Sequence, residues 1–82
     1  MEDEIYTKGE TRALDVIRAQ IRENRRCELS YIEVAQLAGV GKSTARTAVL
    51  KAEKAGDLLV RRRPGDGLSN VLQLPQVAKL AT

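Results

Sequence analysis

Aromatic residues are almost missing from these 82 residues, which hold two tyrosines, no phenylalanine and no tryptophan. A core must therefore be built from alanine, valine, isoleucine and leucine, on helices that pack closely. At this length we expect one small domain over residues 1–82, with an ordered core at about 7–75. A deep substrate cavity does not fit into so small a core, so we expect no enzyme activity.

Histidine is absent and Cys27 is the single cysteine. A structural zinc site usually takes four cysteine or histidine ligands, so we expect no metal site, and nothing indicates a cofactor. Cys27 has no partner for a disulfide within the chain, which fits a reducing compartment. We interpret it as a small apolar residue, partly buried near a helix end, rather than as a catalytic thiol.

Long apolar runs are also missing, and none approaches the ~20 residues of a membrane span. The chain begins with Met-Glu-Asp-Glu, whereas a secretory signal begins with basic residues and continues with apolar ones. We therefore expect a soluble, cytoplasmic protein with no membrane partner.

Positive charge is concentrated in one part of the chain. The formal net charge is +3. Residues 1–10 carry one cation against four acids, whereas residues 42–63 carry seven cations against two acids. A focused basic segment is typical of contact with a polyanion, although a basic helix can also be no more than a solvated face.

The first helix should begin at a capping box. Thr7 and Glu10 have the spacing at which a hydroxyl and a carboxylate satisfy free backbone amides at a helix start, with Thr11 as an alternative cap. We expect residues 1–6 to be a frayed, acidic lead. The helix should run to about residue 24, and its apolar positions predict a buried stripe. That stripe comprises Ala13, Leu14, Ile17 and Ile21.

A second capping box, Ser30 with Glu33, predicts a short helix. Its apolar run comprises Ile32, Ala35, Leu37 and Ala38. Gly39 should end this helix, because glycine adopts the left-handed conformation at a helix C-terminus without steric cost. Val40 should then point inward between the second helix and the third.

The third helix should begin near residues 41–43 and end before Gly56. Its inner stripe comprises Ala45, Ala48, Val49 and Ala52. The pattern then changes to that of two strands over 58–63 and 68–74. These strands are joined by turn residues Pro64–Gly67. Pro75 should end the second strand, because it lacks the amide that a strand ladder needs, and residues 76–81 could form one helical turn.

A two-stranded hairpin is marginal by itself and must lean on the helices. Five residues suit the crossing and turn of a helix-turn-helix: Ala35, Gly39, Val40, Ala45 and Ala48. With the basic hairpin after Gly56, they make residues 10–74 resemble the winged helix-turn-helix domains of bacterial regulators. The similarity is greatest to the GntR type and to the winged domains of plasmid and phage replication or regulatory proteins.

This resemblance implies a mainly α fold with a small β-hairpin, built from three helices and a two-stranded wing. The sequence departs from the family pattern in two ways. Gly41 stands where such families usually place serine, and glycine is a weaker helix cap. We also expect no small-molecule effector domain, although GntR proteins carry one after the wing.

Helical geometry places polar and cationic side chains opposite the inner stripe of the third helix, where they would meet a duplex. Arg46 can donate two hydrogen bonds to guanine, and Ser43 and Thr47 can bond base edges. Thr44 and the remaining cations should meet phosphates, and the hairpin arginines could also enter the minor groove. The full set of expected DNA-binding residues is Lys42, Ser43, Thr44, Arg46, Thr47, Lys51, Arg61, Arg62 and Arg63.

Two further residues on this helix have other interpretations. Lys54 is a weaker candidate for a phosphate contact. Leu50 points outward where the pattern normally has a polar residue. Contact with a partner subunit or a base methyl is one reading of Leu50, and we favour a singly exposed leucine, which is common on protein surfaces.

Residues 39–44 resemble the end of a phosphate-binding P-loop, but Gln36 stands where that pattern requires glycine. A nucleotide-binding role is therefore not expected.

From the winged helix-turn-helix resemblance and the basic third helix we expect sequence-specific binding of double-stranded DNA. The chain would serve as a small transcriptional regulator or as the DNA-reading module of a replication or recombination system, as a homodimer or in tandem on DNA repeats. The alternative is a winged-helix module that docks another protein without direct DNA contact.

Overall fold

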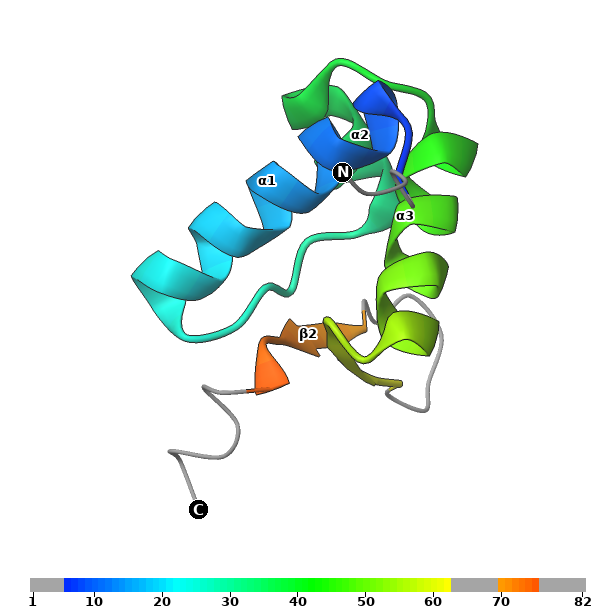
Figure 1. The fold of residues 1–82 in the computed structure, drawn as a ribbon. Coiled ribbons are helices and arrows are strands. Elements are labelled where there is room, and N and C mark those ends of the chain that lie inside the picture. The colour runs from blue at the N-terminus through cyan, green and yellow to red at the C-terminus, as the bar shows by residue number, and fades with distance from the viewer. Residues whose placement is uncertain (1–5, 63–69, 76–82) are drawn as a thin grey trace.

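Three helices are followed by two short antiparallel strands in a computed structural model that describes residues 6–62 and 70–75 (Figure 1). The elements are α1 (Lys8–Asn24), α2 (Tyr31–Ala38), α3 (Lys42–Ala55), β1 (Leu59–Arg61) and β2 (Val71–Gln73). The protein is therefore mainly helical with a small β-sheet. The expected turn at 64–67 and the helical turn at 76–81 lie outside the described residues.

Both predicted capping boxes are present. The Thr7 hydroxyl accepts a hydrogen bond from the Glu10 amide at 3.1 Å, and the Glu10 carboxylate accepts one from the Thr7 amide at 3.0 Å. Thr7, rather than Thr11, is thus the cap of α1. Ser30 and Glu33 make the same reciprocal bonds at the start of α2.

The helix ends are confirmed where glycine predicted them. Gly39 ends α2 with φ 72° and Gly56 ends α3 with φ 83°, both in the left-handed region. α1 ends at Asn24, as predicted, and its C-cap residue Arg25 adopts φ 71° without being glycine. A left-handed arginine is sterically unfavourable, and the sequence did not predict this conformation.

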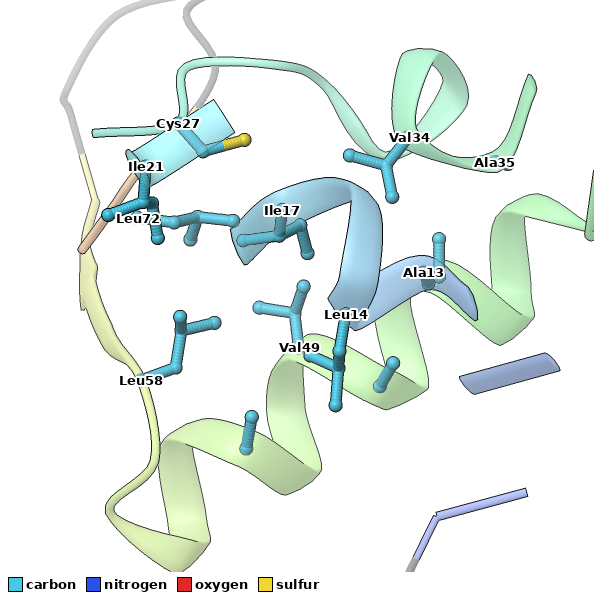
Figure 2. Packing of buried hydrophobic residues seen from close by; sticks show 13 residues of the cluster. Ala13, Leu14, Ile17, Ile21, Cys27, Val34, Ala35, Val49, Leu58 and Leu72 are labelled. Atoms are coloured by element: carbon cyan, nitrogen blue, oxygen red, sulfur yellow. The ribbon is translucent and has the colours of Figure 1, made fainter. Parts of the chain in front are cut away.

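The hydrophobic core lies between the three helices and the sheet (Figure 2). The buried stripe predicted for α1 is confirmed, with Leu14 and Ile17 at the centre facing Val49 of α3. The predicted inner stripe of α3 is also buried throughout. Three of its four members are alanines, whose short side chains let α3 pack closely against α1 and α2.

The apolar run of α2 is only partly buried. Ile32 and Leu37 are 50% and 64% exposed, whereas Val34 and Ala35 are buried. An α2 of eight residues makes about two turns, and only one side of it can face α1 and α3. That side is set by Val34 and Ala35, which leaves Ile32 and Leu37 on either edge of the outer face.

The sheet has a backbone partner that the expected hairpin did not include. Within the described residues, the ladder pairs residues 59–61 with 71–73, and Leu58, just before it, is buried in the core. On the other side of β2, Cys27 and Leu72 exchange two backbone hydrogen bonds, at 2.8 and 2.9 Å. The segment between α1 and α2 thus adds one bridged residue beside β2, and Cys27 is fully buried rather than partly buried.

The lead before α1 also departs from expectation at its last residue. Tyr6 packs against the core instead of fraying, and its hydroxyl donates a hydrogen bond to Asp57 at 3.0 Å. Partial burial, together with the nearby Asp57 carboxylate, raises the pKa of Tyr6. This contact ties the start of α1 to the turn that follows α3, while residues 1–5 lie outside the described residues.

Candidate nucleic-acid interface

The leading end of α3 presents an uncovered polar surface. Ser43, Arg46 and Thr47 are all exposed, on the side opposite the alanine stripe. Gly41 is the N-cap and gives no side-chain hydrogen bond to the first turn, as expected from its lack of a side chain. The free amides and positive dipole end of such a turn favour contact with an anion.

Further along the same face, Leu50 is 36% exposed and Lys54 is exposed in the last turn. Lys42, the first residue of α3, is exposed as well. Leu50 is therefore an exposed leucine on an otherwise polar helix face, as its position predicted. Lys42, Leu50 and Lys54 thus add two cations and one apolar group to the exposed surface of α3.

Thr44 lies on the edge of this face and is half-buried against the start of α1. A Cβ atom added at Gly9 would lie 3.2 Å from the Thr44 methyl carbon. Gly9 weakens the first turn of α1 as a helix former, yet its missing side chain allows the two helices to approach here. Thr44 is consequently less available for a phosphate contact than the sequence suggested.

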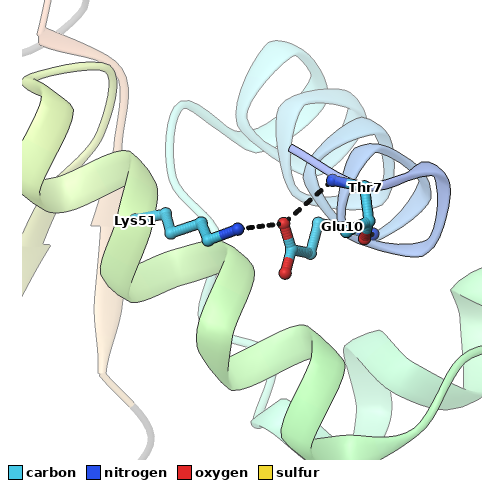
Figure 3. A network of polar contacts seen from close by, with 3 residues as sticks. All are labelled: Thr7, Glu10 and Lys51. Carbon is cyan, nitrogen blue, oxygen red and sulfur yellow. Dashed lines mark hydrogen bonds and ion pairs between the residues drawn. The ribbon is translucent and has the colours of Figure 1, made fainter. Parts of the chain in front are cut away.

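Lys51 makes an ion pair that the sequence did not reveal (Figure 3). Its ammonium group donates a hydrogen bond of 2.8 Å to Glu10 Oε1, the oxygen that also accepts from the Thr7 amide. Glu10 is only 6% exposed. The Lys51 hydrogen bond, followed by the Thr7 amide, lowers the pKa of the Glu10 carboxyl. Lys51 therefore joins α3 to the cap of α1.

The Glu10 carboxylate should make folding sensitive to acid. Because its pKa is lowered in the folded protein, its stabilising effect is complete above the usual carboxyl pKa and is lost as the pH falls through the lowered value. We expect Glu10→Gln to reduce the free energy of unfolding by about 1 kcal/mol at pH 7. The difference from the parent chain should shrink at an acid pH below the usual carboxyl pKa, where Glu10 takes up its proton.

Urea unfolding of both chains at the two pH values measures this difference. Glu23→Gln, at an exposed position of α1, is the matched control and should behave like the parent at both. If Glu10→Gln lowers the free energy of unfolding by the same amount at low pH, the ionised carboxylate is not what stabilises the helix start.

The hairpin cations differ in their surroundings. Arg61 is exposed on β1. The Arg62 guanidinium donates two hydrogen bonds, both 2.9 Å long, to the two carboxylate oxygens of Glu53 on α3. That pair lowers the pKa of Glu53 and fixes Arg62 beside α3, so part of its charge is already balanced. Arg63, the third expected cation, lies outside the described residues.

No family model, curated protein or solved structure matches this chain. Among residues 6–62 and 70–75, no group of three or more histidine, cysteine, aspartate or glutamate side chains could hold a metal ion. No helix in the same part of the chain is long and apolar enough to cross a membrane. The candidate interface therefore rests on the geometry of α3 and on the charges beside it.

Proposed function

We propose that this chain is a winged helix-turn-helix domain that binds double-stranded DNA in a sequence-specific way, with the leading end of α3 in the major groove. The observation that carries the proposal is the joint exposure of Ser43, Arg46 and Thr47 on one face of α3. A helix whose packing side is made of alanine and valine has its opposite side free to enter a groove of B-DNA.

Each side chain of the proposed interface has a defined chemical role. The planar guanidinium of Arg46 would donate two hydrogen bonds to guanine O6 and N7. Ser43 and Thr47 would bond base edges beside it. Lys42 and Arg61 would contact phosphates and so set the register without reading sequence.

Thr44, Lys51 and Arg62 would make smaller direct contributions. Thr44 is half-buried, and the other two would first have to weaken their bonds to Glu10 and Glu53. In this proposal they act mainly by holding α3 against α1 and β1. The domain would serve a transcriptional regulator or a replication or recombination system in the cytoplasm, as a homodimer or in tandem.

A selection of bound sequences from random duplexes, followed by fluorescence anisotropy at several salt concentrations, tests the proposal. We expect an enriched motif and a log–log salt slope of about −3 to −5 over roughly 50–200 mM, since each neutralised phosphate adds about −0.9. A flat salt dependence with no enriched sequence would refute DNA reading by this chain.

The second candidate function is docking to another protein without DNA contact. Its support is the exposure of Ile32 and Leu37 on α2, since apolar side chains on an outer face are common at protein interfaces. Affinity for a protein partner that does not change with salt concentration would favour this function. That affinity should be lost in Leu37→Asp and kept in Arg46→Ala.

A further inference from the structure

The outer face of the sheet carries an open hollow of about 420 Å³ that α3 does not share. Successive residues of a strand point to opposite faces. Cys27, Val60 and Leu72 point into the core, so their neighbours along the chain point outward. The residues that line the hollow are Arg26, Arg61, Arg62, Val71 and Gln73.

The pairing of strands brings these arginines together from distant parts of the chain. Arg26 precedes Cys27, which pairs with Leu72 on one side of β2, and Arg61 pairs with Val71 on the other side. The floor of the hollow is therefore β2, with an arginine on each flank. Arg26 and Arg62 have side chains that are 60% and 55% exposed, so their charge faces water.

Acidic groups near the hollow balance part of this charge. Arg26 contacts the Glu28 carboxylate through Nε, and Arg62 is held by Glu53. A guanidinium has five N–H donors in a fixed fork, so an arginine bound through Nε keeps its terminal N–H groups for another acceptor. Within the part of the chain that the structure describes, three arginines face two carboxylates here, so the hollow is cationic.

We infer that this hollow is a phosphate-binding site, centred on Arg26 and Arg61 and distinct from the α3 surface. One guanidinium can donate two parallel hydrogen bonds to two oxygens of a phosphate. The side-chain amide of Gln73 on the floor of the hollow adds an uncharged donor. The phosphate would belong either to the backbone of a DNA duplex or to a free phosphorylated molecule. The first source rests on the proposed function, and the second is independent of it.

Titration with inorganic pyrophosphate tests the site directly. Chemical shifts of backbone amides in residues 71–73 and of the arginine Nε–H groups should move on binding. The double substitution Arg26→Gln and Arg61→Gln should weaken pyrophosphate binding about 10-fold. Glu28→Gln should strengthen it about 2- to 3-fold, because it releases Arg26. Arg12→Gln, an exposed cation of α1, is the control and should change nothing.

The source of the phosphate is decided by a second titration with duplex DNA. If the backbone supplies it, Arg26→Gln alone, which keeps the proposed phosphate contact of Arg61, should bind duplexes about 3- to 5-fold more weakly, with a salt slope lower by about 1 unit. If pyrophosphate binding changes and duplex binding does not, the ligand is a free phosphorylated molecule. Failure of DNA binding alone would remove the proposed function but not this site.

The inference is overturned if pyrophosphate moves no signal of residues 71–73, or if the double variant and Arg12→Gln respond alike. Circular dichroism of each variant confirms that the fold is kept, which is expected because the substituted side chains are exposed. Opposite responses of the double variant and of Glu28→Gln cannot come from a general loss of structure.

Discussion

Arg46→Ala is expected to weaken binding to a duplex selected by this chain about 10- to 100-fold, since one bidentate arginine–guanine contact contributes ~1–3 kcal/mol of discrimination. Arg46 is exposed on the free side of α3, and the substitution removes no packing. Fluorescence anisotropy on the selected duplex, and on one with the contacted guanine replaced, measures the loss. The variant should lose most of its preference between the two duplexes.

Two further substitutions separate base reading from charge. Arg46→Lys keeps the charge but not the planar fork, so it should lose nearly as much discrimination as alanine while keeping most of the salt dependence. Arg12→Ala removes an exposed cation from α1 and should leave discrimination unchanged. Equal losses of discrimination in Arg46→Ala and Arg12→Ala would mean that Arg46 contributes only to the general electrostatic attraction between the protein and DNA.

Leu14→Ala should lower the free energy of unfolding by about 3 kcal/mol, within the ~2–5 kcal/mol found for truncation of fully buried leucines. Leu14, on α1, is 2% exposed and lies next to Val49 of α3 within the core (Figure 2). Small domains are stable by only ~5–15 kcal/mol, and a core without large aromatic side chains has few groups that can fill the cavity. Urea unfolding at pH 7 gives the value.

Leu37→Ala is the matched control, because it makes the same chemical change at a side chain that is 64% exposed. It should cost less than about 0.5 kcal/mol. Similar losses at positions 14 and 37 would contradict the placement of α2, since Leu37 would then have to be buried.

Features fixed by residues close together in the chain could be predicted from the sequence. Both capping boxes, the glycine ends of α2 and α3 and the alanine stripe of α3 follow from patterns within one or two helical turns. The exposure of Ser43, Arg46 and Thr47 follows from that stripe, because a helix that buries one side exposes the other.

Features that join distant segments were not predictable in this way. The Lys51–Glu10 pair spans 41 residues, and its formation depends on how α1 crosses α3. The pairing of Cys27 with Leu72 lies in a segment with too few residues to show a strand pattern. Hydrophobicity alone also did not indicate which side of the eight-residue α2 meets its neighbours, where Ile32 and Leu37 are exposed and Val34 is buried.

The thiol of Cys27 gives this sheet a built-in reporter. It is the single sulfhydryl of the chain, it has no exposed surface, and burial raises its pKa. Alkylating reagents attack the thiolate and need physical access. Cys27 can therefore be labelled only when β2 and the neighbouring segment separate. The labelling rate thus measures how often this local opening occurs, and no engineered cysteine is needed.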